Sequence, residues 1–152
     1  MLTPASHVRP APHAQRWYTL ASWLVILLGL LHNAVFVSGS MLNVVRRQSS
    51  PVYQSMKEYK IDLIGTHSLL KFYDGFSLTM GCLLILLGTL NLLVSRSLPL
   101  PALRAAALFN AVACLLLTAL SLVYFHLLAT SFFVLALAGY ALCYVRSQRL
   151  PS

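Results

Sequence analysis

The chain has 152 residues, of which 59% are hydrophobic and 9% are charged, and its mean hydropathy is +0.77. This composition excludes a soluble globular protein. The formal net charge of +8 does not indicate a nucleic-acid partner, because the basic residues flank the apolar segments as orientation signals and form no nucleic-acid-binding cluster.

Four apolar segments follow one another along the chain and are separated by short polar stretches. Because roughly 20 apolar residues cross a hydrocarbon core of about 30 Å, each segment is expected to span a membrane as a helix. The predicted fold class is therefore an all-α bundle of four transmembrane helices that forms a single integral membrane domain over residues 1–152. The expected spans are residues 17–37, 74–95, 105–124 and 129–145.

The segment before the first span, residues 1–15, contains Pro4, Pro10 and Pro12 and is predicted to be a disordered tail. A cleaved signal peptide is the alternative interpretation of the first span. The apolar run is longer than the roughly 7–15 residues of a signal-peptide core, so a retained span is preferred.

The long loop between the first two spans has a helical pattern of its own. Ser50 followed by Pro51 is typical of a helix start, and Gly65 is expected to end or bend the helix before the next span. The sequence predicts a short amphipathic helix over residues 51–64, lying on the membrane surface or capping the bundle. Its apolar residues recur at spacings of four, three and four: Val52, Met56, Tyr59 and Leu63.

Basic residues predict the orientation. The two tails and the connection between spans two and three contain arginines and no acidic residue, and four crossings place these three regions on one side. The positive-inside rule then predicts that both termini of this multi-pass protein lie in the cytoplasm. The expected location is a bacterial inner membrane. Aromatic residues at the span ends, Trp17, Tyr18 and Tyr144 among them, are interpreted as an interfacial belt.

Small and weakly polar residues form one helical stripe on the second span and another on the third. Such residues let membrane helices approach closely and exchange hydrogen bonds, so the stripes predict a packing seam. In an antiparallel arrangement Asn91 would lie near Asn110, Gly88 near Cys114 and Gly81 near Ser121. The first span carries a similar row: Ser22, Val25, Gly29 and His32.

Polar residues also gather near the outer ends of the spans. Ionisable groups in a bilayer tend to face a partner or a wet cavity, so these residues form a candidate pocket. Simpler roles remain open, such as an ion pair between Lys71 and Asp74, and haem ligation by His32 and His126 is a further alternative. No metal-binding cluster or catalytic motif is present, so no metal or cofactor is expected. The candidate pocket residues are His32, Asp74, Ser77, Tyr124 and His126.

The run Ser68-Leu-Leu-Lys-Phe-Tyr-Asp-Gly-Phe76 resembles the start of the second span in a family of small bacterial four-span membrane proteins. The layout, with four spans and a long first outer loop, is also similar to the DoxX-like class. This resemblance implies the four-span architecture and no particular activity, so no functional residue follows from it.

Two functions fit these observations. The first is an interaction or accessory component of the membrane, with the lipid bilayer, a second copy of the chain or another membrane protein as its partner. The alternative is a membrane enzyme or carrier for a small lipophilic molecule that uses the outer polar pocket.

Overall fold

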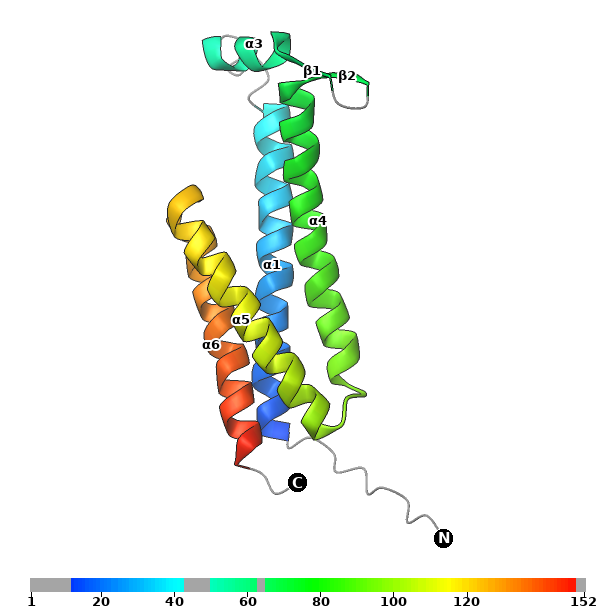
Figure 1. Cartoon of the computed structure of the whole chain (residues 1–152), viewed down its shortest axis with the longest axis vertical. Helices are drawn as coiled ribbons and strands as arrows, with labels where there is room; N and C mark the ends of the chain where they lie inside the picture. The colour runs from blue at the N-terminus through cyan, green and yellow to red at the C-terminus, as the bar shows by residue number, and fades with distance from the viewer. Residues whose placement is uncertain (1–11, 43–49, 63–64, 150–152) are drawn as a thin grey trace. The chain divides into compact units, whose positions relative to one another are not determined.

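The computed structural model describes residues 12–42, 50–62 and 65–149. These ranges contain five helices and two short strands (Figure 1). The four long helices confirm the predicted four-span helical fold. In chain order the elements are α1 (Pro12–Leu42), α3 (Pro51–Glu58), β1 (Lys60–Asp62), β2 (Thr66–Ser68), α4 (Leu69–Ser95), α5 (Leu100–Tyr124) and α6 (Leu127–Gln148).

The chain divides into two compact units. The first, called here the bundle unit, comprises Met1–Leu28 and Leu86–Ser152 and contains α5, α6 and one part each of α1 and α4. The second, called the hairpin unit, comprises Gly29–Ile85 and contains the remaining parts of α1 and α4 together with α3 and both strands. α1 and α4 are each one continuous helix that contributes to both units.

The first helix begins earlier than predicted. α1 starts at Pro12, so residues 12–15 are helical and do not belong to a disordered tail, while residues 1–11 lie outside the described ranges. Tertiary contacts explain the extension: Ala14 is buried, and the Gln15 side chain donates a hydrogen bond to the Ser95 carbonyl at 2.9 Å. Pro12 suits a first helical position because its fixed φ is helical and its missing N–H is not needed there.

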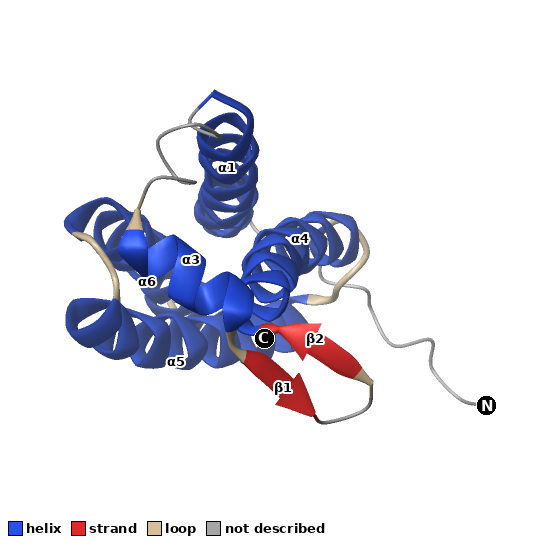
Figure 2. Ribbon diagram, turned by 90° about the horizontal axis from the view of Figure 1, so that it is seen from above, coloured by secondary structure: helices blue, strands red, loops and turns tan. Residues whose placement is uncertain are grey.

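The loop helix is shorter than predicted. α3 ends at Glu58, Tyr59 is extended, and residues 60–62 pair antiparallel with residues 66–68 as a β-hairpin, shown in red in Figure 2. The expected helix over residues 51–64 is therefore wrong for residues 59–62, and its last two positions, 63–64, lie outside the described residues. Gly65 has a φ of +86°, a left-handed conformation that glycine adopts without strain and that a chain reversal requires.

α5 and α6 form an antiparallel helix pair within the bundle unit (Figure 1). Pro99 is extended before α5, and the connection to α6 consists of Phe125 and His126, which are both extended. Each helix buries one stripe of mostly small residues, which allows close packing. On α5 these are Leu100, Leu103, Ala107, Asn110, Ala111, Cys114 and Ser121, and on α6 they are Thr130, Phe133, Ala136, Gly139, Tyr140, Cys143 and Ser147.

Most of the surface of the four long helices is apolar and unburied by protein. Each has the length and hydropathy to cross a membrane, yet only 17–39% of the residues in its most apolar window are buried. Phe109 is 73% exposed and Leu127 is 80% exposed. Lipid would solvate such side chains, so the four apolar helices fit a polytopic membrane protein.

Glycines mark the closest helix approaches within each unit. In the bundle unit, a Cβ on Gly88 of α4 would lie 2.8 Å from the Ser22 carbonyl oxygen and 2.5 Å from Ile26 Cγ1 of α1. In the hairpin unit, a Cβ on Gly29 of α1 would lie 2.6 Å from the carbonyl oxygen of Gly81. Both glycines therefore permit backbone contacts that no other residue would allow.

Replacing Gly88 with alanine should lower stability, because the added methyl group meets backbone atoms of α1 that cannot move aside. Overpacking of this kind typically costs about 1–3 kcal/mol. Gly75→Ala is the matched control on the same helix, since nothing lies within 4 Å of a Cβ at that position. Thermal unfolding of the detergent-purified protein measures both variants. An equal melting temperature for the two would contradict the close packing at Gly88.

Candidate functional site

A buried network of polar side chains joins the four helices of the bundle unit. Asn91 of α4 and Asn110 of α5 form its centre, Tyr18 and Ser22 come from α1, and Tyr140 comes from α6. Tyr18 and Ser22 are fully buried, and Asn110 and Tyr140 are at most 5% exposed. Helices separated by up to 118 residues in sequence thus meet at one cluster of hydrogen bonds.

The two asparagines pair through their amide groups. Asn91 Nδ2 donates to Asn110 Oδ1 at 3.1 Å, and Asn110 Nδ2 donates to Asn91 Oδ1 at 3.2 Å. The Tyr18 hydroxyl lies between the two amides, donating to Asn91 Oδ1 at 2.9 Å and accepting from Asn110 Nδ2 at 3.0 Å. A third helix is thereby bound to the pair.

The second tyrosine closes the network on the other side. Tyr140 Oη accepts a hydrogen bond from Asn91 Nδ2 at 3.2 Å and lies 3.2 Å from Ser22 Oγ. The Ser22 hydroxyl donates to the Tyr18 carbonyl at 2.8 Å, so the Tyr140 hydroxyl is the donor to Ser22. The rings of Tyr18 and Tyr140 meet edge to face, with centroids 5.1 Å apart, a favourable aromatic geometry.

Every side-chain N–H and O–H hydrogen in this network has an acceptor within the protein. Asn110 Nδ2 also lies 3.0 Å from the Ala106 carbonyl, so its two hydrogens have three acceptors within reach. Buried polar groups in an apolar surrounding are favourable only when they are hydrogen-bonded in this way. The network therefore has no donor left over for a ligand, and its geometry suits a structural role.

The predicted seam residues lie in several different contacts. Asn91 and Asn110 are hydrogen-bonded to each other, whereas Gly88 contacts Ser22 and Ile26 of α1. Ser121 Oγ lies 2.9 Å from Thr130 Oγ1 of α6. Cys114 is buried on α5, and Gly81 belongs to the hairpin unit, where it contacts Asn33.

Tyr18 belongs to the buried hydrogen-bond network, but the sequence analysis does not identify it as a member. Its position at the start of the first span suggested an interfacial belt residue, and that interpretation is wrong because the side chain is fully buried. A signal was nevertheless present: Tyr18 lies four residues before Ser22 and extends the row that continues to Val25 and Gly29. Tyr140 occupies the buried stripe of α6 one position after Gly139.

His32 and Ser77, two members of the candidate pocket, are in contact within the hairpin unit. His32 Nε2 lies 3.0 Å from Ser77 Oγ and 3.1 Å from the Ser77 carbonyl oxygen. If Nε2 carries the hydrogen, the ring donates to both oxygens; in the other tautomer, the Ser77 hydroxyl donates to the ring. Either arrangement links α1 to α4 through a polar contact.

Two polar oxygens in the hairpin unit are buried without a hydrogen-bond partner. One is Oδ1 of Asn33, which occupies the space that a Cβ on Gly81 would need, while Nδ2 of the same side chain lies 3.5 Å from Cys82 Sγ. The other is Oδ1 of Asp74. The ion pair between Lys71 and Asp74 stays a prediction.

The remaining pocket candidates belong to the bundle unit. Tyr124 is the last residue of α5 and is 75% exposed, and His126 is the extended, exposed residue before α6. The His126 carbonyl accepts backbone hydrogen bonds from Ala129 and Thr130, which fixes the start of α6. Both residues therefore lie at the same end of the α5–α6 pair.

Within the described ranges, no group of three or more histidine, cysteine or acidic side chains is placed to hold a metal ion. The three cysteines are unpaired thiols; Cys114 and Cys143 are buried, and Cys82 is exposed.

Comparisons with protein-family models, with curated proteins and with solved structures found no match to this chain.

Removing the Tyr18 hydroxyl should weaken the bundle unit. Tyr18→Phe keeps the ring but removes the bond to Asn91 Oδ1 and the bond from Asn110 Nδ2, so a loss of about 1–2 kcal/mol in unfolding free energy is expected. Tyr124→Phe is the control, because that side chain is exposed. Unfolding by added SDS from mild-detergent micelles measures both. If Tyr18→Phe is as stable as the wild type, the hydroxyl does not support the bundle.

Proposed function

We propose that this chain is an accessory component of its membrane, acting by association with another membrane protein or with a second copy of itself and not by catalysis. The observation that carries this proposal is the closed hydrogen-bond network among Tyr18, Ser22, Asn91, Asn110 and Tyr140, whose donors are all satisfied inside the protein. A catalytic or transport site would instead need polar groups available to a substrate.

The outward faces of the helices support the same proposal. On α5, Phe109, Leu116 and Val123 are 61–73% exposed and recur every seven residues, so they share one face of the helix. A rigid apolar face of this kind suits helix–helix contact in a bilayer, where association depends on shape complementarity rather than on a hydrophobic gain.

Site-specific photo-crosslinking in membranes tests this role. With benzoylphenylalanine at Leu116 of α5, we expect a discrete protein adduct, whose mass distinguishes a second copy from a different partner. The same probe at Leu90 of α4, a position that is 49% exposed, is the control for random collisions. Lipid adducts alone at both positions, or equal protein adducts from both, would contradict a specific association.

A second candidate function is a carrier or enzyme for a small lipophilic molecule. It is favoured by the contact between His32 and Ser77 and by the unsatisfied Oδ1 atoms of Asn33 and Asp74, which a bound hydrogen-bond donor would complete. Mass spectrometry of small molecules that copurify with the protein separates the two proposals. A compound lost in His32→Ala, while folding is unchanged, would favour the carrier, and no difference would favour the accessory role.

The proposed orientation has both termini in the cytoplasm, supported by the acid-free arginines of the tails and of the α4–α5 connection. In a Cys82→Ser background, a cysteine introduced at Ser55 of α3 should react with an impermeant maleimide in intact cells. A cysteine at Ser97, between α4 and α5, should react only after lysis. The reverse labelling pattern would overturn this orientation.

A further inference from the structure

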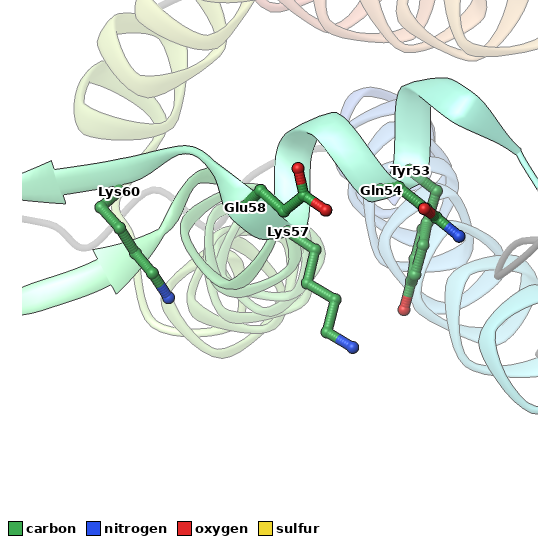
Figure 3. Close-up of a pocket in the computed structure, with 5 residues that line it drawn as sticks. All are labelled: Tyr53, Gln54, Lys57, Glu58 and Lys60. Atoms are coloured by element: carbon green, nitrogen blue, oxygen red, sulfur yellow. The ribbon is translucent and has the colours of Figure 1, made fainter.

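The hairpin unit carries an open pocket outside the long helices. It has a volume of about 670 Å³ and is formed by α3 together with the first residue of β1 (Figure 3). The residues of the buried polar network do not line this pocket, and neither do His32 and Ser77. The residues that line it are Tyr53, Gln54, Lys57, Glu58 and Lys60.

The pocket presents hydrogen-bond donors on one side of the ribbon. Figure 3 shows that the polar ends of Tyr53, Lys57 and Lys60 point to the same side, whereas the Glu58 carboxylate points to the other. Tyr53 and Lys57 are four residues apart on α3 and therefore share a helix face. Within the described ranges, neither lysine forms an ion pair. Two ammonium groups and a phenol are the donor types that bind phosphate oxygens.

Backbone hydrogen bonds hold this pocket next to a membrane span. The Leu69 N–H, at the start of α4, donates to the Tyr59 carbonyl at 2.9 Å, and Lys60 of β1 is paired with Ser68 of β2. The pocket is thus directly attached to the first turn of an apolar helix that is long enough to cross a membrane.

Aromatic residues indicate the depth of that first turn. Phe72, Tyr73 and Phe76 of α4 are all more than half exposed and lie within two turns of the helix start. Aromatic side chains concentrate at the level of lipid headgroups, which places the beginning of α4 in this region. Lys60 is paired with Ser68 directly before this turn and is therefore expected near the level of the lipid phosphates.

We propose that Tyr53, Lys57 and Lys60 bind the phosphate of an anionic phospholipid headgroup. The lining has two cations and one carboxylate, and this net positive charge selects an anionic headgroup over a zwitterionic one. The pocket is also open, so a lipid headgroup can enter while its acyl chains remain in the bilayer beside α4. The inference is independent of the accessory role, because it does not involve the bundle unit.

Native mass spectrometry of the full chain tests the site. The detergent-purified protein is titrated separately with phosphatidylglycerol and with phosphatidylcholine, and bound lipids are counted. A lysine close to an anionic lipid surface strengthens association about fivefold, so Lys57→Gln with Lys60→Gln should weaken phosphatidylglycerol binding about 25-fold. Phosphatidylcholine binding should change little.

Three controls make the result specific. Lys71→Gln removes an exposed lysine of the same unit that does not line the pocket, and it should weaken binding by no more than about fivefold. Lys57→Arg with Lys60→Arg keeps both charges and should also retain binding. Inorganic phosphate at millimolar concentration should not displace the lipid. A loss in Lys71→Gln as large as that in the double glutamine variant, an unchanged double glutamine variant, or displacement by free phosphate would each overturn the proposal.

Discussion

Lipid tails are as apolar as leucine, so the hydrophobic effect does not drive helices together inside a bilayer. Hydrogen bonds and close packing between helices stabilise their association instead. The amide pair of Asn91 and Asn110 is the contact on which the bundle unit depends, because its bonds to Tyr18 and Tyr140 lead to the two other helices. Tyr18 and Tyr140 connect the pair to α1 and α6. The close contact at Gly88 complements this network, since it brings α4 against the same part of α1 that carries Ser22.

The two units treat their polar groups differently. In the bundle unit the donors of the Asn91–Asn110 network satisfy one another, although Nε of Arg104 is buried without a partner. The closed network favours a single arrangement of the helices. In the hairpin unit, Oδ1 of Asn33 and Oδ1 of Asp74 are buried without a partner, and a basic pocket opens beside the start of α4. The two proposals therefore rest on different units: the accessory role on the bundle unit and the lipid site on the hairpin unit. This division supports an accessory role better than a catalytic one.

Hydropathy was sufficient to predict the four long helices, because a membrane span must satisfy its backbone internally and be apolar along its length. The contact of Asn91 with Asn110 was also predictable, since asparagine in a span needs a partner and both residues lie on small-residue stripes. The burial of Tyr18 could not be predicted, because a tyrosine near the end of a span can lie either at the lipid interface or in a buried hydrogen bond. The β-hairpin was missed because Val52, Met56 and Tyr59 continue a helical spacing past Glu58, where local pairing with residues 66–68 prevails. The pocket at Lys57 and Lys60 depends on the chain leaving the helix and entering the β-hairpin, so the spacing of apolar residues could not predict it.

A double-mutant cycle on Asn91 and Asn110 tests the central role of the amide pair most directly. Unfolding free energies of Asn91→Ala, Asn110→Ala and the double variant would be measured by SDS titration of the full chain in mild-detergent micelles. If the pair acts as a unit, either single change leaves the other amide unsatisfied, so the double variant should be hardly less stable than the weaker single variant. The coupling energy should then exceed about 0.5 kcal/mol. Strictly additive losses would show that the two amides contribute independently and would contradict the account.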